Sequence, residues 1–281
     1  MRFERLVWLW LSLMGLMAWE YWCLNHYMSG SIIVALTKVA PQLKSFNLST
    51  EAGKPISYFL GWAGLSVMLV TNLYVLRKRI PAMHKMGRLD AWLDYHIFCG
   101  LLGPTLIVFH TDFKVGGLVA ISFWSMMISA GSGVLGRYFF VKVSRSKAQL
   151  DSNADTFRRK LFNALEKANI STDDPDYLIT RKRFFDFVGA PDSRVDFLGA
   201  VWGSLAGDVR LMMFSIPRVQ PEWPQQTRKY LYGWAMTTRD SVFMEPFRKA
   251  LGYWHAFHVP FTSLMYVTAL VHVVVALAFG V

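Results

Sequence analysis

The sequence predicts an all-α membrane protein with about five transmembrane helices forming a bundle and a mainly helical insert outside the membrane. Hydrophobic residues make up 53% of the 281 residues and aromatic residues 15%, a composition typical of polytopic membrane proteins. Several apolar runs reach the length of about 20 residues that crosses a bilayer. Basic residues cluster at the ends of these runs, as expected for helices with a fixed orientation in a membrane.

The charge and the cysteine content exclude several classes of protein. The formal net charge is +11, but the basic residues flank apolar spans, so we expect no nucleic-acid partner. The two cysteines, Cys23 and Cys99, both lie in apolar runs, and the sequence has no CxxC or CxxCH motif. The usual signals for a c-type haem, an iron–sulfur cluster, a zinc site or a disulfide framework are therefore absent from the sequence.

The first span is predicted over residues 6–28, a run longer than the core of a signal peptide. Glu20 and His26 lie toward its far end. We interpret both as interfacial residues, with proton transfer or contact with a quinone as the alternative. The polar residues 29–54 form the first external loop, in which we expect a short helix at residues 32–39.

Three further spans are predicted, over residues 56–76, 91–110 and 115–135. The connection 77–88 carries five basic residues, residues 136–147 carry four, and neither contains an acidic residue. Because cytoplasmic connections are enriched in lysine and arginine, we place both on the cytoplasmic side. The third span then runs outward, and a tight outer turn follows at residues 111–114.

A long polar insert follows the fourth span, with seventeen basic and thirteen acidic residues. We expect it to lie in the cytoplasm and to contain helices such as 156–168. Residues 195–216 are apolar enough to resemble another span, but their three charged side chains would be costly in lipid, so a surface helix is favoured. The last span covers residues 253–281 and places the C-terminus outside. The predicted domains are 1–142 (four spans), 143–250 (the insert) and 251–281 (the fifth span).

Four histidines form two equally spaced pairs in the third and last spans. Thirteen residues separate His96 from His110, and thirteen separate His258 from His272. Fourteen steps of about 100° end roughly 40° short of four turns, with a rise of about 21 Å, so each pair lies on one face of its helix. If the two helices stand side by side, the imidazoles form an inner pair, His96 with His258, and an outer pair, His110 with His272.

Two facing pairs of imidazoles supply the axial ligands for two six-coordinate b-type haems, since imidazole is a common ligand of haem iron. A polar ring in hydrocarbon is costly and marks a functional residue. For a single histidine the alternatives are packing, a hydrogen bond to a carbonyl group, or a proton path. His255 is the poorer ligand. It lies seventeen steps before His272, which puts it about 100° away from the shared face.

Three other residues are candidates for contact with the haems. Gly100 and Gly103 lie between His96 and His110 and would let a flat macrocycle approach the backbone. Small residues also serve as ordinary helix-packing contacts in membranes. Arg137 follows the fourth span and is placed to pair with a haem propionate, with a simple flanking charge as the alternative.

The segments HIFCGLLGPTLIVFH (96–110) and HVPFTSLMYVTALVH (258–272) resemble the membrane domains of dihaem b-type cytochromes, including respiratory cytochrome b and the ferric reductase and NADPH oxidase group. The resemblance covers residues 56–141 and 250–281. It implies that the four paired histidines are axial ligands and that the stacked haems move electrons across the membrane. Unlike those oxidases, the chain has a long insert before its last span, and we expect no flavin or nicotinamide module in it.

The resemblance and the histidine spacing together predict an electron-transfer subunit of a prokaryotic cytoplasmic (inner) membrane. The subunit would carry electrons between a quinol pool or a cytoplasmic donor and an outer-side acceptor such as a c-type cytochrome. Since we expect no catalytic module in the chain, we expect redox partner subunits, either a c-type cytochrome or an iron–sulfur or flavin protein. The alternatives are a self-contained quinol or metal reductase, and a haem-free transporter or structural subunit.

A quinone site needs an amphipathic cleft at the level of the lipid headgroups and a group that exchanges protons. The inner membrane boundary offers four such residues, namely His84, Asp90, Asp94 and His255. They are the candidates for a quinone site. The alternatives are that these side chains are simply solvated, that a quinone binds at the outer boundary around Glu20 and His26, or that electrons enter from a partner protein.

Overall fold

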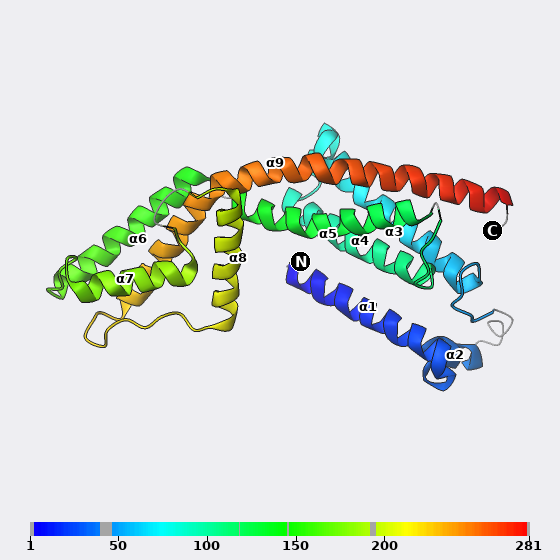
Figure 1. Ribbon diagram of the computed structural model, residues 1–281, viewed down its shortest axis with the longest axis horizontal. Coiled ribbons are helices and arrows are strands. Elements are labelled where there is room, and N and C mark those ends of the chain that lie inside the picture. Colours follow the sequence, from blue (N-terminus) through cyan, green and yellow to red (C-terminus); the bar gives the residue numbers. More distant parts are fainter. Residues whose placement is uncertain (1–2, 40–46, 118, 145, 192–194, 280–281) are drawn as a thin grey trace. The chain divides into compact units, whose positions relative to one another are not determined.

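The computed structural model describes residues 3–39, 47–117, 119–144, 146–191 and 195–279, and every regular element within these ranges is a helix. In chain order (Figure 1) the elements are α1 (Phe3–His26), η1 (Met28–Gly30), α2 (Ile32–Val39), α3 (Pro55–Arg79), η3 (Pro81–Lys85), α4 (Leu89–His110), α5 (Val119–Val143), α6 (Lys147–Lys167), α7 (Pro175–Val188), α8 (Phe197–Met213) and α9 (Gln226–Phe279). Two predictions fall outside the described residues: part of the first external loop, 40–46, and the position of Val281.

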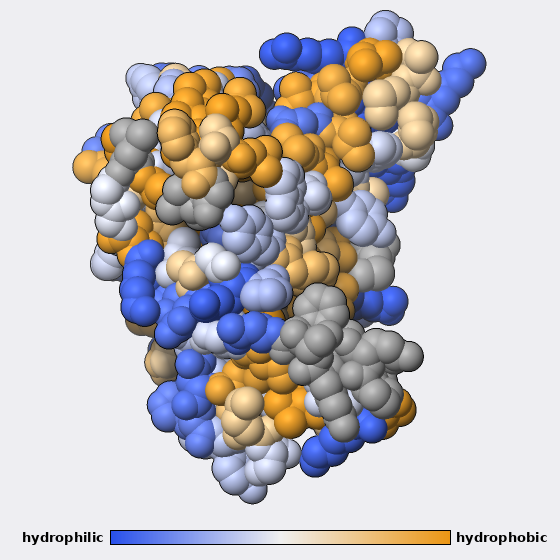
Figure 2. Space-filling model, turned by 90° about the vertical axis from the view of Figure 1, so that its right-hand side faces the viewer, coloured by the Kyte–Doolittle hydropathy of each residue, from blue (hydrophilic) through white to orange (hydrophobic). Residues whose placement is uncertain are grey.

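Among the described residues, five helices are long and apolar enough to cross a membrane: α1, α3, α4, α5 and α9. The predicted all-helical class and number of spans are confirmed at this level, which is compatible with a multi-pass membrane protein. The helix α8 covers most of the ambiguous run 195–216 but has only 17 residues and is not among the five. Large apolar side chains stay exposed on the five helices, for example Trp8 (69%) and Phe59 (71%), and Figure 2 shows hydrophobic surface beside hydrophilic surface.

The chain divides into two compact units. The first comprises Met1–Val134 and His258–Val281, and the second comprises Leu135–Phe257. In the first unit, buried methionines of three helices meet: Met68 of α3, Met126 of α5 and Met265 of α9. The hydroxyl of Tyr266 on α9 also donates to the carbonyl oxygen of Met68 at 2.7 Å. These contacts hold α3, α5 and α9 together around one core.

The helices α3 and α4 approach each other closely at two glycines. A Cβ added to Gly103 would lie 2.5 Å from Cγ of Met68 and 3.2 Å from the carbonyl oxygen of Gly64. The absence of side chains therefore sets this helix spacing. The helix α1 lies against α4 as well, where the indole of Trp10 donates to the hydroxyl of Thr105 at 3.0 Å.

The connections at one end of the spans contain two of the predicted local structures. The short helix expected at residues 32–39 is confirmed as α2. The carboxylate of Glu20 caps its start by accepting from the backbone N–H groups of Ile32 (2.9 Å) and Ile33 (3.0 Å). The tight turn predicted after α4 is also confirmed, with left-handed φ values at Asp112 (52°) and Phe113 (57°).

Two helices extend far beyond the apolar runs that predict them. The predicted fourth span ends at residue 135, but α5 continues to Val143. The predicted fifth span begins at residue 253, but α9 is one continuous helix of 54 residues from Gln226. The expected helix boundaries were wrong here because hydropathy reports the surroundings of a helix, whereas its backbone hydrogen bonds continue through polar residues.

The second unit is built around α9 and the insert helices. The predicted helix at 156–168 is confirmed within α6, whose Leu161 and Leu165 are fully buried with Phe184 of α7. The guanidinium of Arg239 on α9 is 1% exposed and donates to Asp208 of α8 at 3.0 Å. Asp208 also pairs with Lys142 of α5 at 2.9 Å, so one carboxylate joins three helices of this unit.

Candidate functional site

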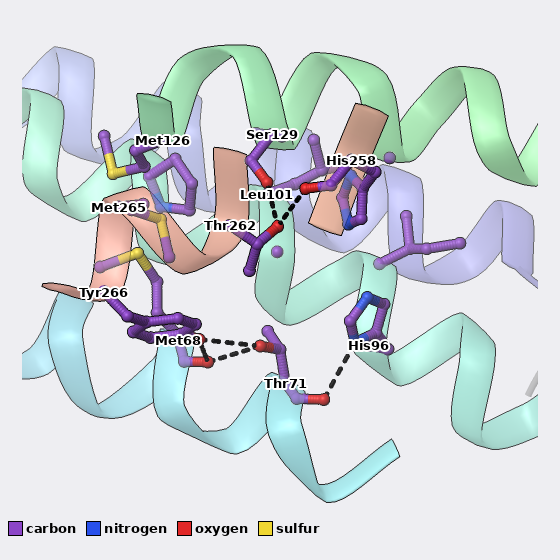
Figure 3. A pocket seen from close by; sticks show the side chains of 15 residues that line it. Met68, Thr71, His96, Leu101, Met126, Ser129, His258, Thr262, Met265 and Tyr266 are labelled. Carbon is purple, nitrogen blue, oxygen red and sulfur yellow. Dashed lines mark hydrogen bonds between the residues drawn. The ribbon is translucent and has the colours of Figure 1, made fainter. Parts of the chain in front are cut away.

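The histidines predicted as the inner pair border one cavity in the first unit. The cavity is lined by residues of α3, α4, α5 and α9, including His96 and His258, and its volume is about 70 Å³. Figure 3 shows His96 and His258 on its wall, with Thr71 and Ser129 among the polar neighbours. The same wall includes the buried methionine cluster described above.

Each ring of this inner pair is held through Nδ1 by an oxygen atom of a neighbouring helix. Nδ1 of His96 lies 2.9 Å from the carbonyl oxygen of Thr71, which can only accept, so Nδ1 carries the proton. Nδ1 of His258 lies 2.7 Å from the hydroxyl of Ser132. Because that hydroxyl already donates to the carbonyl oxygen of Ser129 at 2.9 Å, Nδ1 of His258 is also the donor.

The first ring of the predicted outer pair is held in the same way. Nδ1 of His110 lies 2.7 Å from the carbonyl oxygen of Ser57 and 3.1 Å from its hydroxyl. The hydroxyl itself donates to the carbonyl oxygen of His110 at 2.9 Å. A Cβ added to Gly61 would lie 2.9 Å from the His110 ring, so this glycine makes room for the imidazole.

The two rings of the outer pair face each other across α4 and α9. The ring centroids of His110 and His272 are 6.5 Å apart, with an angle of 62° between the ring planes. With a metal–nitrogen bond of about 2 Å, two imidazoles on opposite sides of one metal ion have ring centres roughly 6 Å apart. The observed separation is close to that value, and it also lies within the 4.5–7 Å of ordinary contacts between aromatic rings.

The donor set fits a haem with two imidazole ligands. A metal-ligating histidine almost always donates its second ring N–H to a carboxylate, a carbonyl group or water. His96 and His110 donate Nδ1–H to carbonyl groups and His258 donates to a hydroxyl, which places the lone pair of each of these three rings on Nε2. No group of three or more histidine, cysteine, aspartate or glutamate side chains suited to a metal ion occurs in the described part of the chain.

The volume of the inner cavity limits this fit. At about 70 Å³ it is smaller than the roughly 300–1,000 Å³ of ordinary ligand pockets. A macrocycle therefore requires the lining side chains to move. Three of them are the methionines Met68, Met126 and Met265, whose unbranched, flexible chains adapt easily.

The other three residues predicted to contact the haems, Gly100, Gly103 and Arg137, have different surroundings. Gly100 borders the cavity, and no heavy atom lies within 4 Å of a Cβ built there. Gly103 instead packs α4 against α3, which was the alternative for it. Arg137 belongs to the second unit, whereas both histidine pairs belong to the first.

The four residues predicted for an inner quinone site do not form one described site. His84 in η3 is exposed. Asp90 forms an exposed ion pair with Arg88 at 2.5 Å. Asp94 lies one turn further along α4, and His255 belongs to the second unit. None of the four lines the cavity between the inner histidines.

Two features of the site did not emerge from the sequence pattern. The serines Ser57 and Ser132 contact the rings, but their only sequence signal is a small polar residue in an apolar run. Residues 131–136, GSGVLG, have the spacing of a dinucleotide-binding loop. That loop requires a strand before it and a helix after it, whereas these residues lie inside α5. Ser132 instead faces His258, and Gly133 lies 4.0 Å from its ring, measured from an added Cβ.

The fold and the site define the chain as a helical protein suited to a multi-pass position in a membrane, with two pairs of histidines between its helices. No known protein family, characterised protein or solved structure matches the chain. Its function is therefore argued from its own residues.

Proposed function

We propose that the chain is a dihaem cytochrome b subunit that transfers electrons across a cytoplasmic membrane. The observation that carries the proposal is the meeting of α4 and α9 at two levels. His96 and His258 border one cavity, and His110 and His272 face each other at 6.5 Å. Two helices that present equally spaced imidazoles to each other have the arrangement needed for two stacked six-coordinate haems.

The side chains around the histidines hold the rings in place. The carbonyl oxygens of Thr71 and Ser57 and the hydroxyl of Ser132 fix the tautomer and the orientation of three rings. When bound, a b haem supplies the one-electron redox change. The chain contributes the ligands, the distance of about 21 Å along the helices between the two levels, and an apolar environment.

The predicted orientation assigns the two histidine pairs to the two sides of the membrane. With the basic connections in the cytoplasm, His96 and His258 serve the inner level and His110 and His272 the outer level. Electrons then pass between a quinol pool or a cytoplasmic donor and an outer acceptor such as a c-type cytochrome, within an assembly of redox partner subunits. An inner quinone site at Asp90, Asp94 and their neighbours remains a prediction.

A haem-free membrane subunit is the second candidate function, and one observation favours it. The inner cavity has a volume of only about 70 Å³, and the Nδ1 hydrogen bonds satisfy one nitrogen of three rings without a ligand. In this case the histidines serve helix packing or proton transfer. The two functions differ in whether the purified chain holds iron.

The test is haem content per chain in the purified protein and in ligand variants. The proposal expects two haems per chain by pyridine haemochrome assay in the wild type. His110→Ala or His272→Ala should leave one haem, as should His96→Ala or His258→Ala. The matched control His84→Ala changes an exposed ring and should keep two. A wild-type chain without haem would support the haem-free subunit, and two haems in all four ligand variants would defeat the ligand assignment.

A further inference from the structure

A second cavity lies in the first unit, away from the inner histidine pair. Its volume is about 480 Å³, and its walls come from the last third of α1, from α2, from residues 47–50, from the first two turns of α3, and from Phe109 of α4. This volume falls within the roughly 300–1,000 Å³ of ligand pockets. The pocket is not enclosed, so a ligand can enter it from outside the chain.

The chemistry of the walls is apolar. Side chains such as Leu24, Ile33 and Leu60 line the cavity. Each of its five polar wall residues has a hydrogen-bond partner within the chain. Glu20 caps α2, and the hydroxyl of Tyr21 donates to Asp112 at 2.6 Å.

The other three polar wall residues have nearby partners. The side-chain oxygen of Asn47 accepts from the backbone N–H of Ser49 at 2.9 Å. The hydroxyl of Thr37 donates to the carbonyl oxygen of Val34 at 2.8 Å, and the hydroxyl of Thr50 accepts from Asn25 at 3.0 Å. A ligand with several hydrogen-bonding groups would leave those groups unpaired, which is costly in an apolar site. The occupant is therefore mainly apolar.

The position of the cavity indicates how such a molecule arrives. The walls include the end of α1, the start of α3 and the residue before the end of α4, so the cavity lies where apolar spans meet the polar connection 47–54. An amphipathic molecule would place its chain between the helices and its head group toward that connection. Molecules of this kind are dissolved in the bilayer.

We infer that the cavity between α1, α2 and α3 binds the apolar chain of a lipid-borne molecule with a compact head group. Two sources share this chemistry: a quinone with a hydrocarbon tail, and the acyl chain of a membrane lipid. The quinone source rests on the proposed function. On α3, Ile56 and Leu60 line the cavity, while Ser57 and Gly61 contact His110. A bound quinone would therefore lie across this one helix from the outer histidine pair.

The test uses two photoreactive probes added to the full chain in phosphatidylcholine vesicles. One probe is palmitic acid with a diazirine in its chain, and the other is a benzoquinone with a diazirine in a decyl chain. After illumination, peptide mass spectrometry compares labelling of residues 17–24 with labelling of the lipid-facing residues of α9, such as Leu270 and Leu277. We expect the cavity residues to be labelled more strongly and an excess of unreactive probe to compete.

Variants on opposite walls locate the binding. Leu60→Trp on α3 and Ile33→Phe on α2 fill the cavity, and each should lower its labelling about tenfold, the scale of a poorly fitting side chain in a pocket. The matched control Leu69→Trp changes an exposed leucine of the same helix and should label like the wild type. With two filling variants on different helices, a folding defect in one does not decide the result.

The outcomes separate the two sources and the two proposals. Labelling by the quinone probe alone assigns the cavity to a quinone, and labelling by palmitate, with or without the quinone probe, assigns it to lipid chains in general. Labelling no stronger than that of α9, or labelling that both filling variants leave unchanged, would overturn the inference. Labelling requires no haem. The labelling result therefore stands even if the haem assay contradicts the dihaem proposal.

Discussion

At the scale of single residues, the candidate ligands are distinguished by what holds them. His96, His110 and His258 each donate Nδ1–H to an oxygen atom on another helix. A buried donor left without an acceptor costs about 1–3 kcal/mol, so these acceptors stabilise the rings in one orientation. No comparable hydrogen bond to the His272 ring occurs among the described residues, and this ring instead lies at a steep angle to the ring of His110. The outer pair therefore contains the less constrained ring.

The first prediction at this scale concerns Ser132. Ser132→Ala removes the acceptor for Nδ1 of His258 but leaves the ligand itself. Loss of such a supporting group typically lowers metal affinity about 10- to 100-fold, so haem titration of the apoprotein should show weaker binding at one of two sites. The matched control Ser144→Ala removes a hydroxyl that bonds the carbonyl oxygen of Val141 at the exposed end of α5 and should bind both haems normally. Equal affinities in both variants would show that Ser132 does not position the ring.

The sequence could predict the ligands but not what holds them. Equal spacing on two spans selects the four histidines, because helix geometry alone puts each pair on one face. The oxygen acceptors belong to α3 and α5, and two of them, Thr71 and Ser57, use their backbone carbonyl groups. A backbone acceptor leaves no sequence signal. The distinction between Gly100 and Gly103 was equally inaccessible, because it depends on which helix lies opposite each residue.

At the scale of elements, that distinction makes a paired prediction for α4. Gly103→Ala would place a Cβ 2.5 Å from Cγ of Met68 and against the backbone of α3, and such overpacking costs about 1–3 kcal/mol. Gly100→Ala adds its methyl group to open space and should stabilise the helix by up to about 1 kcal/mol. Thermal unfolding in detergent should show a lower midpoint for Gly103→Ala and an equal or higher midpoint for Gly100→Ala. Identical midpoints would mean that α3 and α4 are not in close contact at this glycine.

The second unit depends on one carboxylate shared by three helices. Asp208 of α8 accepts from Arg239 of α9 and from Lys142 and Tyr138 of α5. Burial works to raise the pKa of Asp208, but the hydrogen bond and charge of Lys142, the charge of Arg239 and the hydroxyl of Tyr138 hold that pKa below its ordinary value. The ionised carboxylate therefore stabilises the folded unit.

Asp208→Asn tests this network. The substitution leaves Arg239, which is 1% exposed, with Asp240 as its remaining acidic partner. Breaking a buried pair costs about 3–5 kcal/mol, and the remaining partner puts the expected loss near 3 kcal/mol. Denaturant unfolding followed by tryptophan fluorescence measures it. The matched control Asp155→Asn removes an exposed pair with Arg158 and should change stability by less than about 0.5 kcal/mol.

The same variant has a defined pH dependence. Because the pKa of Asp208 is lower in the folded chain, its contribution is complete above the unfolded value of about 3.9 and is lost as the pH falls through the lower folded value. The difference in stability between the wild type and Asp208→Asn should be constant at neutral pH and shrink below about pH 4. A difference that stayed constant into strong acid would assign the loss to packing rather than to the charge.

Hydropathy predicts the spans of this fold but not the full length of its helices. Five spans and the short α2 could be predicted, because length, apolar content and flanking polar loops define them. The continuity of α9 could not, because the change near residue 250 from polar to apolar side chains changes the surroundings and not the helical backbone. Pro246 and Pro260 do not interrupt the described helix either.

At the scale of the whole molecule, the distribution of charge between connections predicts the orientation. The connections 77–88 and 136–147 carry five and four basic residues with no acidic one, whereas residues 29–54 carry three lysines and one glutamate. In the turn after α4, Lys114 pairs with Asp112 at 2.9 Å. Tyr21, through its hydrogen bond, and Lys114 hold the pKa of Asp112 below its ordinary value, so that turn is electrically neutral. Positive charge is thus concentrated in the connections on one side, and the positive-inside rule predicts that this side faces the cytoplasm.

The corresponding prediction compares two introduced cysteines on intact cells. In a background of Cys23→Ala and Cys99→Ala, Asn153→Cys places a thiol on the exposed face of α6, and Ala52→Cys places one in the exposed connection before α3. With the insert in the cytoplasm, an impermeant maleimide should label Ala52→Cys and leave Asn153→Cys unlabelled until the membrane is opened. Labelling after opening confirms that both thiols are accessible in the folded chain. The opposite labelling pattern would reverse the predicted orientation. His96 and His258 would then lie at the outer level, and electrons would enter the histidine pairs from the opposite side.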